Sequence, residues 1–188
     1  MTKTLIIGVS GAGTNISQYL VEKMPDSPEL LLINSDSKSL DKHLATNRVY
    51  LDLALSSETK RDLRLTDTVE RMKNEILSYT YEKTNIIVVV GLGGNTGTNS
   101  IFAITNLTNM SSKNVTLVAV LPFRFESSRR RLAEQKLTML KNSLSLNMIE
   151  FDNDSVMNRD VSLTEGFQKA NEIILSNILA TLQPNRVT

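Results

Sequence analysis

Short, nearly continuous apolar runs alternate along the chain with longer segments in which apolar residues recur at helical spacing. Strands that are buried on both faces of a parallel sheet give such unbroken runs, so the runs predict strands. The alternation of strands and helices predicts a doubly wound α/β fold, with a mostly parallel sheet and helices on both faces. The predicted strands are residues 5–9, 30–33, 86–90, 115–121 and 148–151, and the predicted helices between them are 15–24, 37–44, 66–81, 100–110 and 129–143.

Two segments fall outside this regular alternation. Residues 52–64 are polar and charged and predict a loop, whereas residues 162–182 predict one long C-terminal helix that Pro184 ends. The chain has 188 residues, 40% of them hydrophobic, and this length can bury a core of its own. We therefore expect a single domain over residues 1–188, with no second domain after the long helix.

Composition argues against several classes of protein. The chain has no cysteine and one histidine, His43, so we expect no disulfide and assign no metal ligand among the side chains. The formal net charge of +1 gives no reason to expect a nucleic-acid or membrane partner. No apolar run approaches the ~20 residues of a membrane helix, and the N-terminus lacks the pattern of a signal peptide. We expect a cytoplasmic protein.

Polar and glycine-rich residues gather after the predicted strands, where open α/β sheets bind their ligands. The first of these loops, Gly8–Asn15, joins a strand to a helix. Glycine lets the backbone come close to a phosphate, and a helix N-terminus offers unpaired N–H groups. The loop lacks the Lys-Ser/Thr pair of a P-loop and the spacing of the dinucleotide-binding fingerprint, so a tight turn without a ligand stays an alternative.

A second glycine loop, Gly91–Ser100, is more specific. It also joins a buried strand to a helix, so two helix N-termini are predicted to face one anion. Neither loop contains a lysine. The charge of a phosphate would then be met by backbone N–H groups, hydroxyls, helix dipoles and an Mg²⁺ ion.

Six blocks of the sequence, in family order between Leu5 and Leu182, resemble the tubulin/FtsZ family. Gly93–Asn99 resembles its G-G-G-T-G-[ST]-G signature, with Asn95 and Asn99 at the third and last glycine positions. The other blocks are Gly8–Asn15 for the first glycine loop, Asn34-Ser35-Asp36 for N-T-D, Pro122–Arg130 for P-F-x-F-E-G-x-x-R, Asn153-Asp154 for the N-D pair after the sixth strand, and Phe167 with Asn171-Glu172 for F-x-x-A-N-D.

The resemblance implies that the chain binds GTP or GDP, with Mg²⁺ accompanying the triphosphate, and rejects ATP. A carboxylate that accepts hydrogen bonds from guanine N1–H and its exocyclic amine gives recognition that adenine cannot supply. The implied residues are Gly11, Ala12, Gly13, Asn15, Gly94, Asn95, Thr96, Gly97 and Thr98 for the phosphates, Glu126 and Arg130 for the ribose, Asn153, Phe167, Asn171 and Glu172 for guanine, and Asn34 and Asp36 in the second-strand loop.

The chain departs from the family in ways that bear on hydrolysis. Residues 53–61, which follow the third strand, contain no glycine, so sensing of a γ-phosphate is not implied there, although Lys60 or Arg61 could supply a different contact. Glu172 is one methylene longer than the family's aspartate. The sequence stops at Thr188, before the acidic loop and second domain that complete hydrolysis in the family. We therefore expect nucleotide binding with little hydrolysis by the usual head-to-tail route.

Three hypotheses of function remain open. The first is a GTP/GDP-binding module with weak or absent autonomous hydrolysis, which acts in assembly or regulation and pairs with itself or with a full-length FtsZ/tubulin-like protein. The second is an active GTPase whose acid comes in trans or from Asp52, Glu58 or Asp62. The third is a structural or interaction domain that has lost nucleotide exchange. A dinucleotide-dependent dehydrogenase is disfavoured because the second glycine loop has no role there.

Several of these residues also have plainer interpretations. Phe167 could belong to the core, Glu126 to a solvated charged turn, and Glu172 to an exposed helix surface. The predicted C-terminal helix carries two apolar rows. One row is expected to face the sheet and the other to lie uncovered, which favours self-association or protein binding. The first row is Leu163, Phe167, Ala170, Ile174, Ile178 and Thr181, and the second is Leu175, Leu179 and Leu182.

Overall fold

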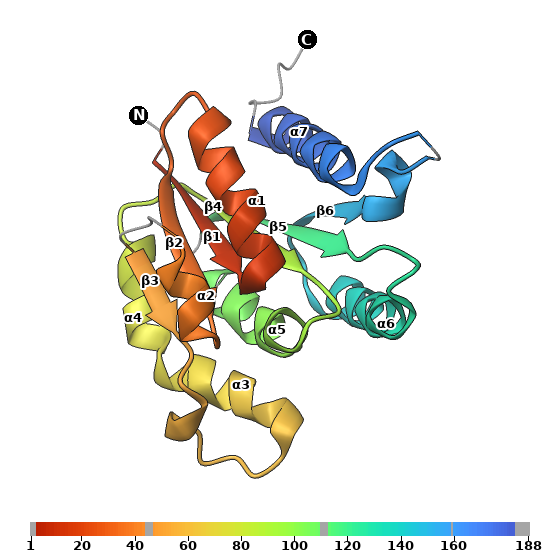
Figure 1. The fold of residues 1–188 in the computed structure, drawn as a ribbon. Coiled ribbons are helices and arrows are strands. Elements are labelled where there is room, and N and C mark those ends of the chain that lie inside the picture. Colours follow the sequence, from red (N-terminus) through yellow and green to blue (C-terminus); the bar gives the residue numbers. More distant parts are fainter. Residues whose placement is uncertain (1–2, 44–46, 110–112, 159, 183–188) are drawn as a thin grey trace.

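The computed structural model describes residues 3–43, 47–109, 113–158 and 160–182. Their strands form one parallel sheet in the order β3-β2-β1-β4-β5-β6. Helices cover both of its faces, so the predicted doubly wound α/β class is confirmed (Figure 1). The strands are β1 (Thr4–Val9), β2 (Glu29–Asn34), β3 (Asn47–Tyr50), β4 (Asn85–Gly91), β5 (Asn114–Leu121) and β6 (Asn147–Asp152).

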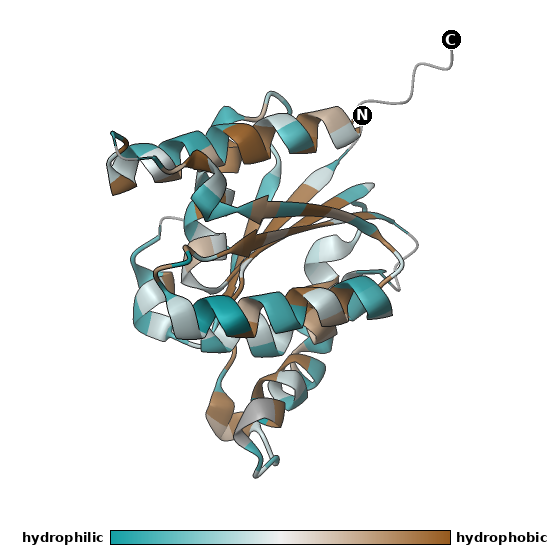
Figure 2. Ribbon diagram, turned by 90° about the vertical axis from the view of Figure 1, so that its right-hand side faces the viewer, coloured by the Kyte–Doolittle hydropathy of each residue, from teal (hydrophilic) through white to brown (hydrophobic). Residues whose placement is uncertain are grey.

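Two helical layers enclose the sheet, which lies between them when seen along its edge (Figure 2). On one face lie α1 (Ser10–Lys23) and α7 (Leu163–Leu182), and on the other lie α3 (Arg61–Arg71), α4 (Lys73–Thr80), α5 (Asn95–Asn109) and α6 (Ser127–Ser143). The short helix α2 (Ser37–Asp41) contacts β2 and β3.

The central strands are mostly apolar because neighbouring residues face opposite cores. In β1, Ile6 packs with Leu20 and Ile174 on the α1/α7 side, whereas Leu5 and Ile7 pack on the α5 side. All of these side chains are fully buried. Burial of one such side chain contributes about 1.5–3 kcal/mol, so the two cores fix the sheet and the loops that leave it.

The region between β3 and β4 differs most from the prediction. β3 did not appear among the predicted apolar runs because Val49 is its only fully buried residue. The predicted loop 52–64 contains the 3₁₀ turn Leu53–Leu55 and the start of α3. The predicted helix 66–81 is two helices, α3 and α4, which meet at Met72. The Asp67 carboxylate accepts hydrogen bonds from Ser56 Oγ at 2.8 Å and Ser57 N at 2.9 Å, and so ties the irregular segment to α3.

The long helix α7 is confirmed, but its apolar rows are only partly as predicted. Ala170, Ile174 and Ile178 face the sheet and are buried, whereas Leu163 and Phe167 are each 47% exposed. The prediction that a leucine row lies uncovered is wrong, because its members are half-buried and pack against the α1/α7 core. Pro184, and the predicted helix ends at 44 and 110, lie outside the described residues. Within the described ranges, no helix is long and apolar enough to cross a membrane.

Candidate functional site

The strand order places a crevice between β1 and β4. From β1 the chain proceeds outward to β2 and β3, and then returns to β4 on the other side of β1. Such a reversal opens a crevice at the carboxyl ends of the two strands, which is where open α/β sheets bind ligands. Helix α1 begins at Ser10, directly after β1, and α5 begins at Asn95, after the turn that follows β4. Both helix N-termini therefore lie at this edge.

A cavity of about 470 Å³ opens at this edge, within the range of roughly 300–1,000 Å³ that small-molecule sites occupy. Most of the residues that the resemblance implied line it. These are Gly11, Ala12, Asn34, Asp36, Gly94, Asn95, Thr96, Glu126, Asn153 and Phe167. The other lining residues, to which the sequence motifs gave no role, are Ser10, Ser39, Gly91, Leu92, Val120, Pro122 and Arg129. The implied residues outside the lining are Gly13, Asn15, Gly97, Thr98, Arg130, Asn171 and Glu172.

Three glycines around the cavity allow close packing between the loops. A Cβ at Gly13 would lie 2.4 Å from Val89 O, and a Cβ at Gly97 would lie 2.5 Å from Gly91 O. At Gly93, which has φ +91°, a Cβ would lie 2.7 Å from Arg129 O. These positions need glycine for the fold itself, because real Cβ atoms do not approach a backbone oxygen so closely.

Two other glycines have no such reason in the fold. A Cβ at Gly11 or Gly94 would meet nothing within 4 Å, and the positive backbone angles of the chain fall elsewhere. Both residues line the cavity. An open glycine on a cavity wall lets the backbone N–H groups come close to a ligand, as phosphate-binding loops do. Gly11 and Gly94 are therefore suited to a ligand and not to packing.

The first turn of α1 leaves its N–H groups without a side-chain cap. Ser10, which begins the helix, has a left-handed backbone with φ 69° and lines the cavity. Its carbonyl accepts a hydrogen bond from Thr14 Oγ1 at 2.7 Å, which holds this turn in place. The first N–H groups of a helix have no partner within it, and the helix dipole adds partial positive charge there.

The second-strand loop is joined directly to the start of α5. Ser35 Oγ and Thr96 Oγ1 are 2.5 Å apart and share a hydrogen bond. Asn34 is buried, and its Oδ1 accepts from the Asp36 N–H at 3.3 Å, while Asp36 Oδ1 accepts from the Ser39 N–H at 3.3 Å. The loop that carries Asn34 and Asp36 is thus fixed against the phosphate-loop candidate Thr96.

Two neighbouring arginines on α6 have different surroundings. Arg129 lines the cavity, and its guanidinium is 3.0 Å from Glu126 Oε2. Arg130 instead makes a bidentate ion pair with Asp152 at 2.6 and 2.8 Å and contacts Glu134 at 2.7 Å. The hydrogen bonds between Arg130 and Asp152 raise the pKa of the arginine and lower the pKa of the carboxyl. Arg130 therefore packs beside β6 and lies off the cavity wall.

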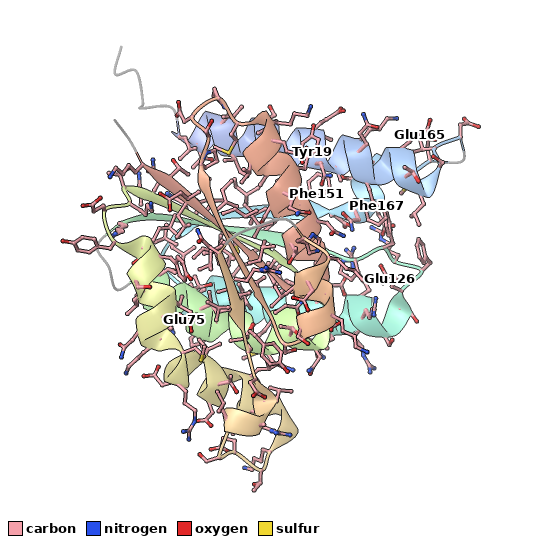
Figure 3. All side chains as sticks on the ribbon, turned by 60° about the vertical axis from the view of Figure 1, so that its left-hand side comes forward. Tyr19, Glu75, Glu126, Phe151, Glu165 and Phe167 are labelled. Atoms are coloured by element: carbon pink, nitrogen blue, oxygen red, sulfur yellow. The ribbon has the colours of Figure 1, made fainter. Side chains whose placement is uncertain are left out.

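Phe167 lines the cavity and packs against an aromatic cluster. Phe123 is buried, stacks on Phe125 with ring centroids 5.1 Å apart, and meets Phe167 edge to face at 5.4 Å. Ser162 and Glu165 cap each other's N–H groups at the start of α7, which fixes the turn that carries Phe167. Phe167 and Glu126 come from α7 and the start of α6 and lie on the same side of the molecule (Figure 3).

The implied guanine-binding residues are only partly brought together. Asn153 is buried and lines the cavity beside Phe167. Glu172 lies one turn farther along α7, where it is exposed and its Oε1 accepts from Gln168 Nε2 at 3.2 Å. Among the described residues, no group of three or more His, Asp or Glu side chains is arranged to hold a metal ion.

Comparison with known proteins gives relatives of one kind. The sequence matches no protein-family model. It is 25% identical over 187 residues to the mitochondrial division protein fszB of Dictyostelium discoideum, an alignment that covers 94% of this chain and 50% of fszB. It is 26% identical over 177 residues to the cell division protein FtsZ of Neisseria gonorrhoeae, covering 90% and 44%. The chain spans about half the length of the curated relatives it matches.

Solved structures share the fold. FtsZ of M. jannaschii, as an empty dimer, matches with a TM-score of 0.77 and 20% identity over 95% of this chain and 53% of its own. CetZ2 of Haloferax volcanii, as a GTPgS-bound protofilament, matches with a TM-score of 0.78 and 20% identity over 96% and 58%.

The sheet order and the two glycine loops at its switch point define a nucleotide-binding type of α/β domain. The resemblance in sequence and the match in fold together make this chain FtsZ/tubulin-like, as the motifs predicted.

Proposed function

We propose that the cavity binds a guanine nucleotide, GTP or GDP, and that the chain is an FtsZ/tubulin-like assembly module controlled by that nucleotide. The observation that carries the proposal is the pair of open glycines, Gly11 in the first turn of α1 and Gly94 directly before α5, which both line the cavity. Their backbone N–H groups are available to phosphate oxygens. Similarity to CetZ2 bound to GTPgS and to CetZ1 bound to GDP supports the choice of ligand.

The base is proposed to lie at the aromatic end of the cavity. Phe167 offers an exposed ring face or edge, and buried Asn153 offers an amide beside it. Glu172 and Asn171 are proposed to complete the reading of guanine from α7, which requires the Glu172 carboxylate to leave Gln168. Glu126 is proposed to accept hydrogen bonds from the ribose hydroxyls. Arg130 does not line the cavity and is proposed to stabilise the part of the wall that carries Glu126.

A triphosphate would need a cation in this cavity. Among the described lining residues the charged side chains are Asp36, Glu126 and Arg129, and Arg129 is already paired with Glu126. Two carboxylates and one guanidinium leave the wall net negative. We propose that Mg²⁺ bound mainly by the phosphates neutralises this charge, since Mg²⁺ commonly uses few protein ligands. Asp36 is the carboxylate on the wall that could reach it.

Hydrolysis by the isolated chain is proposed to be weak or absent. Asp52 caps the 3₁₀ turn by accepting from Ala54 N at 2.9 Å, and Glu58 is exposed; neither lines the cavity. The side chain of Asp62 lies outside the described residues. Neither Asp52 nor Glu58, the two described acids of this segment, is thus placed to orient a water, which general-base catalysis requires.

Self-association is proposed as the output of nucleotide binding. The similar structures include an FtsZ dimer and a CetZ2 protofilament. A partner, whether a second copy or a full-length FtsZ/tubulin-like protein, would meet the open edge of the sheet where the cavity lies. A bound nucleotide would then lie at the subunit contact, and assembly would depend on whether the nucleotide is present.

A titration with GTP, GDP and ATP tests the proposal. We expect GTP and GDP to bind far more tightly than ATP, and Gly94→Ala to weaken GDP by about tenfold or more while leaving the unfolding midpoint unchanged. Phosphate release in the same preparation should stay at background, and light scattering should rise with GTP. Equal affinity for ATP, or an unaffected Gly94→Ala variant, would contradict the assignment, and linear phosphate release would favour the active GTPase.

A further inference from the structure

Two asparagines stand at the start of α5, where the family signature has glycines. Asn95 is exposed and lines the cavity, and Asn99 is half-buried one helical turn later. Asn99 Nδ2 donates to Asn95 Oδ1 at 3.0 Å. Residues four apart lie on one helix face, so the two departures from the signature are partners in one hydrogen-bonded pair.

This hydrogen bond engages the oxygen of the Asn95 amide and leaves its nitrogen facing away from Asn99. With Oδ1 engaged by Asn99, the Asn95 Nδ2 has no partner among the described residues, and both of its N–H donors are available. Asn99 is itself held from the opposite side, because its backbone carbonyl accepts from Thr66 Oγ1 on α3 at 3.1 Å. A glycine at either position could supply neither the donor nor the support.

Cationic donors are few in the cavity, although Asn34 and Asn153 also bring side-chain amides to its wall. Among the described lining residues there is no lysine, and the one arginine, Arg129, is engaged by Glu126. A side-chain amide adds donors to an anion without adding a charge, and hydrogen bonds to charged groups are stronger than neutral ones. A phosphate oxygen would favour the orientation in which Nδ2 of Asn95 faces it.

We propose that the Asn95 side chain is a phosphate-binding group and that Asn99 is the positioning residue that turns its N–H donors toward the phosphates. The inference rests on the proposed nucleotide site and assigns to this chain a side-chain contact that a glycine signature cannot make. The hydrogen bond from Thr66 Oγ1 to the Asn99 carbonyl also joins this part of α5 to α3.

Affinity for guanosine, GDP and GTP, measured with Mg²⁺ present, tests the pair. Asn95→Ala and Asn95→Gly should each weaken GDP and GTP by about tenfold while guanosine is unchanged, because guanosine has no phosphate. Asn99→Ala should cause a smaller loss, which should disappear when Asn95 is already alanine. In Asn99→Asp, the new carboxylate can only accept a hydrogen bond, so it should bind the Asn95 Nδ2 and turn the Asn95 Oδ1 toward the phosphates. This variant should therefore weaken GDP binding more than Asn99→Ala does.

Asn106→Ala is the matched control, because it removes an amide from the same helix outside the cavity. Unfolding midpoints show whether each variant is folded. If one of the two Asn95 variants does not fold, the other still tests the proposal. Unchanged ratios of GDP to guanosine affinity, or an Asn99→Ala loss that persists without the Asn95 amide, would overturn the assignment while leaving the nucleotide site intact. Wild type that binds neither GDP nor GTP would overturn the proposed function, and this inference with it.

Discussion

The two ends of the cavity are built in different ways. At the proposed phosphate end, the wall comes mainly from the first turns of α1 and α5 and includes the open glycines Gly11 and Gly94. At the proposed base end, Phe167 of α7 and Asn153 after β6 line the wall, and Phe123 after β5 packs against Phe167. The first end is determined by where two strands stop, whereas the second depends on how β5, β6 and α7 pack together.

Because of this difference, the two ends need different amounts of side-chain rearrangement when a ligand binds. The phosphate end is held by short internal bonds, such as that between Ser35 and Thr96, before any ligand binds. At the base end, Glu172 is exposed and bonded to Gln168, and Arg130 is bonded to Asp152. We infer that the phosphate end is preorganised and that the base end rearranges on binding. A preorganised site binds more tightly because fewer side chains must be immobilised on binding.

The largest expected effect tests the distinction between packing and ligand glycines. Gly13→Ala would place a Cβ 2.4 Å from Val89 O, so strand β4 or helix α1 must shift. We expect the free energy of unfolding to fall by about 2 kcal/mol or more, as in overpacked cores. Gly11→Ala, two residues earlier in the same helix, should leave it unchanged or slightly higher, because alanine favours a helix by roughly 0.5–1 kcal/mol over glycine.

Urea denaturation of the two variants, compared with wild type, provides the measurement. The comparison fails if Gly13→Ala is as stable as wild type, since the close approach would then have no cost. It also fails if Gly11→Ala is strongly destabilised, because Gly11 would then serve the fold. GDP affinity should fall in the folded Gly11→Ala protein.

The same contrast explains how far the sequence could predict the molecule. Unbroken apolar runs predicted the sheet class, and glycine-rich strand ends predicted the two loops whose residues Gly11, Gly94 and Asn95 line the cavity. Arg130 and Arg129 are adjacent in a run of three arginines, and nothing local says which one faces the cavity. That choice comes from Asp152 on β6, a contact between residues far apart in sequence. Likewise, β3 was missed because only Val49 in it is fully buried.

Two variants at the base end should reduce selectivity for guanine. Asn153→Ala removes an amide that is already on the wall, and Glu172→Ala removes a carboxylate that must move to reach the base. We expect each to weaken GTP by about 1.5–3 kcal/mol, the usual scale for a hydrogen bond to a charged or buried group, and to leave ATP binding unchanged. Competition titrations measure both. If Glu172→Ala binds GTP like wild type, guanine is read without α7's carboxylate.

The smallest expected effect concerns the ion pair that keeps Arg130 off the wall. Asp152→Asn should cost about 1 kcal/mol of stability at neutral pH, because the pair is partly exposed and one oxygen acceptor is retained. Since Arg130 lowers the pKa of the Asp152 carboxyl, its stabilisation is complete above the unfolded pKa of about 3.9. It is lost as the pH falls through the lower folded value. The difference between wild type and variant should therefore be constant from neutral to weakly acidic pH and shrink in strong acid.

The same variant tests whether Arg130 can contribute to nucleotide binding once its ion pair with Asp152 is removed. Freed from Asp152, its guanidinium still contacts Glu134, and Glu134→Gln alone should change stability less because Glu134 is more exposed. If the base end rearranges on binding, the Asp152→Asn protein binds GDP at least as tightly as wild type although it is less stable. A fall in affinity that parallels the fall in stability would mean that the Arg130–Asp152 pair is part of a rigid wall, and that both ends of the cavity are preorganised.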